Sequence, residues 1–374
     1  MNRNKIKIEL PSIQSLKFKL QNGKNLMDLF SFSRKNVLTV GMKFALYLIQ
    51  ERKGENMLLV SLPDPLPEKE RGYLTAFVYP MKVYFQEKFL NAAHEIPLHK
   101  IQIWLTYGSD ITKEALNQMP SLKWIQVFQS GIEKVPLEEL KKRGILLTNI
   151  KGIHGIPMSE HAISTILYFA KNLEKYTFNK QKHLWDRCGH DDEIYGKTIS
   201  IFGAGTVGTA IAERCCDFGM RVIGVNTSGE HKSPFDEMYA MKDKETVLKT
   251  SDFVLLLLPS IPETYHCISR HELSLMKESA YLINLGRGSL INNQDLIHSL
   301  KSGSIRGASL DVFEEEPLPE DSPLWETPHL LITPHMAART WRYYERALEK
   351  FALNFNAFQQ GELPPYIINL NKGY

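Results

Sequence analysis

A glycine-rich turn between an expected strand and an expected helix constrains this chain most. Residues 198–202 are apolar or β-branched, which predicts a buried strand, and a helical pattern follows the turn. The turn has the spacing G-x-G-x-x-G, which permits a tight bend and lets a pyrophosphate approach the backbone beside the positive end of a helix. A plain loop glycine cluster lacks this context, so the run predicts a dinucleotide site. The expected cofactor contacts are the residues of the turn: Gly203, Ala204, Gly205, Thr206, Val207 and Gly208.

The size and composition indicate an ordinary globular protein with room for two domains. The chain has 374 residues, of which 43% are hydrophobic and 23% are charged. Its apolar runs are too short to cross a bilayer, so we expect no membrane contact. The four cysteines show neither paired nor metal-ligand spacing, which predicts reduced thiols in the cytoplasm and no metal site.

The positive charge is concentrated in the first part of the chain. Residues 1–56 contain 11 Lys/Arg and 4 Asp/Glu, a net of +7, whereas the remaining 34 basic and 38 acidic residues give −4. The main part therefore offers no electrostatic reason to bind nucleic acid. The leader could be a transit segment, although its acids and scarce arginine argue against this.

We expect instead that Met57 is the true start and that residues 1–56 are not part of the fold. The run Lys53–Met57 can be encoded by a purine-rich ribosome site just before a start codon. An intact N-terminus at Met1 in the native protein, found by mass spectrometry, would refute this.

Strand and helix patterns alternate along the rest of the chain, which predicts an α/β protein with parallel sheets. A long helix over 157–184 is expected to pack between domains or subunits, and a last helix is expected over 340–361. The other expected strands are 58–61, 101–105, 123–128, 145–148, 220–226, 251–259, 280–285, 307–310 and 330–333. Further helices are expected at 113–119 and 137–143.

Chemically active side chains follow three of these strands. Arg287 comes just after the strand at 280–285, Asp311 and then Glu316 follow the next strand, and His335 follows the last. Ligands of open parallel sheets lie beyond the carboxyl ends of the strands. These residues are therefore expected on the cofactor side.

The set suits reduction of a 2-keto acid beside a nicotinamide. Arg287 can hold the carboxylate with a planar fork, and His335 can protonate the carbonyl oxygen as hydride arrives. Glu316, bonded to the other imidazole nitrogen, would orient the ring and favour its protonated form. Singly, these residues could be a turn arginine, a solvated glutamate and a loop histidine, but behind a dinucleotide motif they predict catalysis.

Three ordered runs, at 284–292, 307–319 and 332–335, resemble the D-isomer-specific 2-hydroxyacid dehydrogenase family. This family includes glyoxylate/hydroxypyruvate reductases, D-lactate dehydrogenases and phosphoglycerate dehydrogenase. The resemblance extends from Met57 to the C-terminus, and it implies that Arg287, Glu316 and His335 are the catalytic residues. The family's glutamate directly precedes a proline, which favours Glu316 over its two glutamate neighbours.

The resemblance also implies a fold and an assembly. It implies a Rossmann-type doubly wound parallel sheet at 155–335 and a discontinuous, flavodoxin-like α/β substrate domain at 57–154 and 336–374. Catalysis would occur in the cleft between them, and members are usually homodimers.

Further site residues follow from the same resemblance. Ser130 and Gly131 match the loop whose backbone N–H groups bind the substrate carboxylate together with Arg287. Asp311 matches the residue that binds the nicotinamide carboxamide, and Pro259 and Thr264 match the loop beside the cofactor. For His154, a cofactor contact and ordinary loop packing both remain open.

The end of the second strand departs from the pattern of NAD-preferring sheets. Those sheets usually carry Asp or Glu there to bind the ribose 2′-hydroxyl, but this chain has Asn226, followed by Thr227 and Ser228. Losing the carboxylate removes repulsion against a 2′-phosphate, and His231 and Lys232 are nearby. Hydroxyls and a cation can bind such a phosphate, which makes NADP(H) the favoured cofactor. No arginine is present to bind the phosphate, so NAD(H) remains the alternative.

The leading hypothesis is therefore an NAD(P)-dependent reductase that converts a small 2-keto acid into a D-2-hydroxy acid. A corepressor-like protein that senses NAD(P) without physiological turnover is the alternative from another class, because such proteins can keep the catalytic residues. Formate dehydrogenase relatives fit less well, since they carry a glutamine at the position of Glu316.

Overall fold

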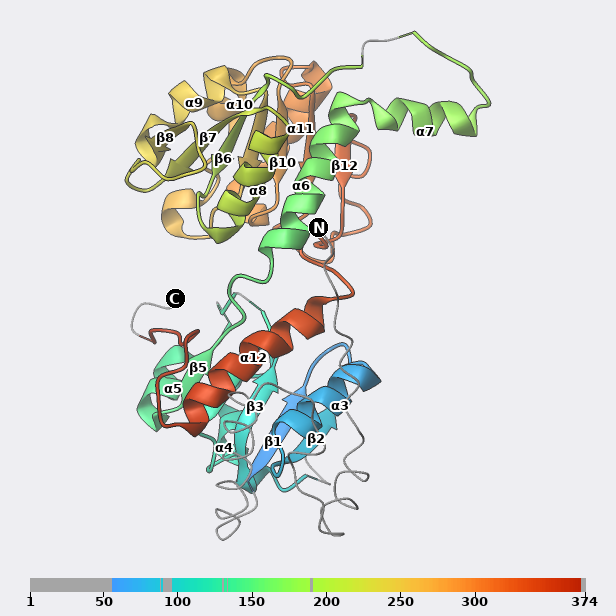
Figure 1. The fold of residues 1–374 in the computed structure, drawn as a ribbon. Helices are drawn as coiled ribbons and strands as arrows, with labels where there is room; N and C mark the ends of the chain where they lie inside the picture. The colour runs from blue at the N-terminus through green and yellow to red at the C-terminus, as the bar shows by residue number, and fades with distance from the viewer. Residues whose placement is uncertain are drawn as a thin grey trace, which may run out of the picture.

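The structure is a computed structural model that describes residues 56–87, 89, 96–129, 131–132, 134–188 and 191–370. The expected leader therefore lies outside the described residues, apart from Asn56. Two parallel sheets organise the chain, one of five strands and one of seven. In Figure 1 they form two units, joined where the chain crosses between them.

The seven-stranded sheet has the order β12-β11-β10-β9-β6-β7-β8, and all its pairs are parallel. This is the doubly wound dinucleotide-binding order, in which the direction of winding changes between β6 and β9. The expected Rossmann-type sheet is confirmed. Its strands are β6 (Thr198–Phe202), β7 (Arg221–Asn226), β8 (Glu237–Ala240), β9 (Phe253–Leu256), β10 (Tyr281–Asn284), β11 (Gly307–Leu310) and β12 (Leu330–Ile332).

Helices cover both faces of this sheet, which explains why its central strands are apolar on both sides. Ile201 packs in a core with α6 and α8, whereas its neighbour Phe202 packs in the core on the opposite face. All four residues of β9 are buried. The helices are α6 (Gly155–Ala170), α8 (Thr206–Asp217), α9 (Lys244–Thr250), α10 (Arg270–Leu275) and α11 (Asn293–Ser302), with short 3₁₀ turns η4 (Met241–Asp243), η5 (Pro262–Thr264) and η6 (Gly288–Leu290).

The five-stranded sheet is also parallel, with the order β2-β1-β3-β4-β5. This is the flavodoxin-like order that the resemblance implied. Its strands are β1 (Met57–Ser61), β2 (Lys82–Gln86), β3 (Ile101–Thr106), β4 (Trp124–Val127) and β5 (Leu146–Thr148). Its helices are α3 (Glu68–Phe77), α4 (Lys113–Gln118), α5 (Leu137–Arg143) and α12 (Tyr343–Gln359), with the 3₁₀ turn η3 (Leu98–Lys100).

The last helix returns to the five-stranded sheet although it follows the last strand of the other sheet. In α12, Phe351 stacks on Trp124 of β4 with ring centroids 5.3 Å apart. Asn354 donates a buried hydrogen bond of 2.8 Å to Gln126. Figure 1 shows α12 beside the five-stranded sheet, away from the helices of the other unit. The chain thus crosses between the sheets twice, at 149–154 and at 333–342.

Three local features differ from the sequence prediction. The single helix expected over 157–184 is wrong: α6 ends at Ala170, and α7 (Leu173–Gln181) starts after Asn172, whose φ of 51° is left-handed. Strands β2 and β8 were not expected, because both lie at sheet edges and carry polar residues that weaken the apolar signal.

Within the described residues, no helix is long and apolar enough to cross a membrane.

Candidate active site

The glycine turn has the geometry of a phosphate cradle. Gly203 has φ +112°, and a Cβ there would lie 3.0 Å from the carbonyl oxygen of Leu257. A Cβ on Gly208 would lie 2.2 Å from the carbonyl oxygen of Gly203, so only glycine lets α8 pack this close to the turn. At Gly205, no atom lies within 4 Å of the place that a Cβ would take. Since the first N–H groups of a helix lack intrahelical partners, the start of α8 fits a pyrophosphate.

The polar loop at the end of β7 is joined to the glycine turn through Lys232. The Asn226 Oδ1 atom accepts hydrogen bonds from the N–H groups of Ser228 (3.0 Å) and Gly229 (2.5 Å). The Lys232 ammonium donates to the carbonyl oxygen of Ala204, 2.9 Å away, inside the glycine turn. Thr227 and Ser228 are exposed beside them. The sequence placed Lys232 near this strand end, but only the structure joins it to the glycine turn.

The histidine and the glutamate of the expected trio are in direct contact. His335 Nδ1 lies 2.7 Å from Glu316 Oε2, and the other carboxylate oxygen of Glu316 accepts from the N–H of Phe313 at 2.9 Å. Both side chains are partly open to solvent, with 55% of His335 and 35% of Glu316 exposed. The pair therefore leaves the second imidazole nitrogen, Nε2, as the one that can meet a ligand.

Arg287 belongs to a turn that is packed against the glutamate loop. Asn284 holds this turn, because its amide group donates to the Arg287 carbonyl at 2.9 Å and accepts from Gly286 N–H at 3.0 Å. A Cβ on Gly288 would lie 1.9 Å from the carbonyl carbon of Phe313. Gly288 thus lets the Arg287 turn lie against the Phe313–Glu316 loop, backbone on backbone. The sequence pattern alone does not indicate this role of Gly288.

Asp311 holds the segment that carries His335. Its carboxylate, 1% exposed, accepts from the Thr333 hydroxyl at 2.6 Å and from the N–H groups of Met336 and Ala337, both at 2.9 Å. Its backbone carbonyl accepts from His335 N–H at 2.8 Å. These bonds hold His335 in a left-handed conformation (φ 51°), which is costly for a residue with a side chain and is typical of functional sites.

The loop expected beside the cofactor is closed by internal bonds. The buried Thr264 hydroxyl donates to the Pro259 carbonyl at 2.6 Å and accepts from Ile261 N–H at 3.1 Å, so it shapes this loop. The Ser260 and Ser289 hydroxyls are 2.8 Å apart, which joins the loop to the Arg287 turn. The Thr264 hydroxyl is therefore bonded within its own loop and holds the shape of that loop.

The expected carboxylate loop follows β4 in the five-stranded sheet. Ser130 lies outside the described residues, whereas Gly131 and the buried Ile132 are described. The loop begins at Phe128, whose N–H donates to the Thr106 carbonyl at 2.8 Å. Gly131 and the His335–Glu316 pair thus follow the carboxyl ends of strands in different sheets.

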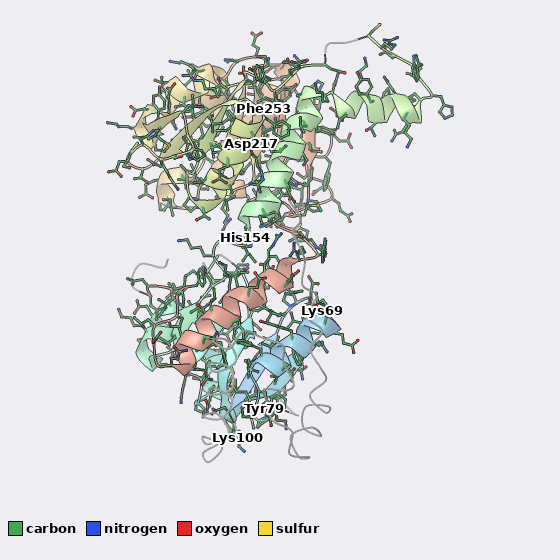
Figure 2. The ribbon with its side chains drawn as sticks, viewed as in Figure 1. Lys69, Tyr79, Lys100, His154, Asp217 and Phe253 are labelled. Carbon is green, nitrogen blue, oxygen red and sulfur yellow. The ribbon has the colours of Figure 1, made fainter. Side chains whose placement is uncertain are left out.

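His154 lies between the two units, as Figure 2 shows. It directly precedes α6, and its ring centroid is 5.8 Å from that of Tyr343 at the start of α12. Burial lowers the pKa of His154 to about 4. The two crossings of the chain therefore meet at this ring pair.

The described residues contain no group of three or more His, Cys, Asp or Glu side chains that could hold a metal ion. Cys215 and Cys267 are buried, and burial raises their pKa to about 12 and about 11. All four cysteines are unpaired. Buried thiols of this kind are packing residues, not nucleophiles.

Comparisons with known proteins agree on one family. Residues 163–337 match the family described as D-isomer specific 2-hydroxyacid dehydrogenase, NAD binding domain. A glyoxylate reductase from Thermococcus gammatolerans is 35% identical over 269 residues, which cover 69% of this chain and 80% of the relative.

Two solved structures show the same arrangement. A D-isomer specific 2-hydroxyacid dehydrogenase family protein from Aeromonas salmonicida superposes with a TM-score of 0.77 and 30% identity, covering 85% of this chain and 100% of the other. An NADPH-dependent glyoxylate/hydroxypyruvate reductase from Sinorhizobium meliloti, solved in complex with NADP and sulfate, superposes with a TM-score of 0.71 and 26% identity. The match covers 85% of this chain and 100% of the other. The chain belongs to the D-isomer-specific 2-hydroxyacid dehydrogenase family, whose members are NAD(P)-dependent oxidoreductases.

Proposed function

We propose that this protein reduces a small 2-keto acid, of the glyoxylate or hydroxypyruvate type, to the D-2-hydroxy acid with a reduced nicotinamide cofactor. The observation that carries the proposal is the His335–Glu316 contact of 2.7 Å beside the Arg287 turn. It lies at the same sheet edge as the glycine turn. The relatives named above are reductases or dehydrogenases, which favours turnover over the corepressor-like alternative.

The three catalytic residues divide the chemistry. Arg287 would hold the substrate carboxylate by a charged fork, together with backbone N–H groups of Ser130 and Gly131. His335 would donate the proton from Nε2 to the carbonyl oxygen, and Glu316 would keep the ring oriented through Nδ1. The bound cofactor supplies the hydride that reaches the keto carbon, so one hydride and one proton convert the carbonyl into an alcohol.

The cofactor would bind along the carboxyl edge of the seven-stranded sheet. The glycine turn would hold the pyrophosphate, and the Pro259–Thr264 loop would lie beside the nicotinamide. Asp311 remains our proposed partner of the carboxamide. Because its carboxylate already accepts three bonds from the chain, this contact requires a further lone pair of the same group.

The strand-end geometry supports NADP(H) over NAD(H). The Oδ1 atom of Asn226 is occupied by two backbone N–H groups, which leaves its NH₂ group to meet a ligand. A 2′-phosphate can accept from this group, from the hydroxyls of Thr227 and Ser228, and from the Lys232 ammonium held at Ala204. A cation at this place substitutes for the missing arginine.

We infer domain boundaries from the two crossings. Residues 57–154 and 336–374 would form the substrate domain, and residues 155–335 the dinucleotide-binding domain. The packing of α12 on β4 supports this division. The substrate would then lie between the two sheets.

We also propose a homodimer formed through the α7 region. Its helix projects from the seven-stranded unit (Figure 1) and, with the following loop, exposes large apolar side chains. Beside it, at the amino ends of the strands, lies a hollow of about 890 Å³ lined by Phe169 and Tyr281. The exposed side chains are Leu173, Tyr176, Phe178, Leu184 and Trp185. Light scattering should give twice the chain mass, and a monomer at micromolar concentration would refute the proposal.

We propose a reducing, cytoplasmic compartment for this protein, which the unpaired thiols support.

The direct test is nicotinamide oxidation, followed by absorbance with NADH or NADPH and a panel of glyoxylate, hydroxypyruvate, pyruvate and a bulkier 2-keto acid. Turnover should fall by about a hundredfold or more in His335→Ala, because general acid catalysis contributes on that scale. Cofactor binding should persist. Glu315→Gln is the matched control for Glu316→Gln, since only Glu316 contacts His335. Absence of turnover with the whole panel, despite measurable cofactor binding, would refute the reductase proposal.

A further inference from the structure

Two adjacent tyrosines at the start of α12 reach the carboxyl ends of two strands in the five-stranded sheet. The Tyr343 hydroxyl donates to the carbonyl oxygen of Phe128 at 2.8 Å, and the Tyr344 hydroxyl donates to that of Asp64 at 2.8 Å. Phe128 follows β4, and Asp64 follows β1. The bonds are alike in length and type, but only the first reaches the segment that leads into the proposed carboxylate loop.

The bond from Tyr343 is the second hydrogen bond that holds the backbone of Phe128, the residue that begins this loop. Phe128 is completely buried, and its N–H is already bonded to the Thr106 carbonyl. Its carbonyl lies beyond the last residue of β4, where the ladder no longer supplies a donor. Tyr343, which is 215 residues away in the sequence, supplies that donor.

The segment that leads to Tyr343, residues 335–343, carries His335 at its other end. Asp311, in the seven-stranded unit, accepts from the N–H groups of Met336 and Ala337. Only the short stretch from there to Tyr343 connects the two attachments. It is compacted by bonds from Arg339 N–H to the Met336 carbonyl (2.8 Å) and from Tyr343 N–H to the Thr340 carbonyl (3.0 Å).

We propose that Tyr343 is a positioning residue that sets the carboxylate loop relative to His335. The segment 335–343 is attached to one sheet through Asp311 and to the other through the Tyr343 hydroxyl. A substrate whose carboxylate is held by the loop then presents its carbonyl to His335. The proposal rests on the proposed function, and it adds a residue of α12 that touches neither substrate nor cofactor.

The Tyr343 hydroxyl remains protonated and can therefore keep donating this hydrogen bond. Burial, with the neighbouring Tyr107 hydroxyl, raises the pKa of Tyr343, so it remains a donor at working pH. Its ring also contacts His154, which belongs to the other crossing. Replacement by phenylalanine would keep these ring contacts and remove the hydroxyl, with its bond to Phe128 and its contact with the Tyr107 hydroxyl.

The experiment compares Tyr343→Phe with Tyr344→Phe as its matched control. In Tyr343→Phe, the KM for the keto acid should rise about threefold to tenfold, which corresponds to losing one hydrogen bond that holds the loop. The NADPH dissociation constant should be unchanged, and kcat should change less than KM. Tyr344→Phe should have wild-type kinetics. Equal effects in the two variants, or a wild-type KM in Tyr343→Phe, would overturn the proposal.

Hydrogen exchange separates this inference from the proposed function. A peptide containing Gly131 and Ile132 should exchange faster in Tyr343→Phe than in wild type or Tyr344→Phe, with or without turnover. If wild type reduces no keto acid, the proposed function fails while the exchange result still decides whether Tyr343 holds the loop. Unchanged exchange in Tyr343→Phe would reject the inference even in an active enzyme.

Discussion

Replacing His154 should remove a specific part of the protein's pH sensitivity. The side chain is partly buried between the two crossings of the chain, where it packs on Tyr343. Burial lowers its pKa from 6.5 to about 4, so it stays neutral in the folded protein down to about pH 4. In the unfolded chain the same imidazole takes up a proton near its ordinary pKa. Acidification therefore favours unfolding.

The size of the effect follows from the two pKa values. Because the folded-state pKa is depressed, the stabilisation by neutral His154 is complete above about pH 6.5 and is lost as the pH falls toward 4. Each pKa unit corresponds to about 1.4 kcal/mol. Between about pH 7 and about pH 5, linkage predicts a loss of about 2 kcal/mol from this residue.

Urea unfolding of wild type and His154→Gln at several pH values would measure this contribution. The difference between the two proteins in free energy of unfolding should change by about 2 kcal/mol from pH 7 to pH 5, since Gln does not titrate in this range. Subtracting the two proteins cancels other titrating groups, such as His161, whose pKa is also lowered by burial. His99→Gln, at an exposed position, is the control.

A pH-independent difference between wild type and His154→Gln would refute the reasoning. It would mean that water reaches the imidazole in the folded protein, or that the crossings separate at low pH without global unfolding. A difference of the opposite sign would mean that the folded protein stabilises the imidazolium.

Two further predictions follow from the cofactor edge and the catalytic loops. Lys232→Met should weaken NADPH binding about tenfold by loss of a charged contact and leave NADH binding unchanged; isothermal titration measures both, with Lys249→Met as control. Equal effects on the two cofactors would argue against a 2′-phosphate contact. Gly288→Ala should lower the free energy of unfolding by about 1–3 kcal/mol and reduce turnover, because its Cβ would lie 1.9 Å from the Phe313 carbonyl carbon. Gly72→Ala, where nothing lies within 4 Å, should not destabilise the protein, and wild-type thermal unfolding of Gly288→Ala would contradict the close approach.

The parts of the fold that could be predicted are those encoded by neighbouring residues. The glycine turn could be predicted because strand, glycine spacing and helix follow one another in the sequence. In the structure, Gly203 and Gly208 lie so close to neighbouring backbone that a Cβ would not fit. The β9 region was expected because a strand buried on both faces is apolar throughout. Edge strands β2 and β8 lack that signal. The break at Asn172 was not predicted, because helical periodicity does not report a single left-handed residue.

The candidate site was predictable to the extent that its residues follow strands of one sheet. Glu316 and His335 were expected to meet, and they are 2.7 Å apart. The resemblance favoured Glu316, and neither composition nor spacing could exclude its neighbours. In the structure, Glu314 instead contacts His266 at 2.9 Å. Which glutamate faces the histidine depends on how the loop folds.

By itself, the sequence determined the α/β class, the place of the glycine turn and which residues are proposed for catalysis. These properties depend on residues close together in the chain, because strands, turns and helices form from local patterns. Only the tertiary structure decided that α12 packs on the five-stranded sheet, that Lys232 reaches Ala204, and that Tyr343 bonds to Phe128. Such contacts join residues that are separated in the sequence, and they form because packing helices and loops against each sheet brings apolar surfaces together and pairs donors with acceptors.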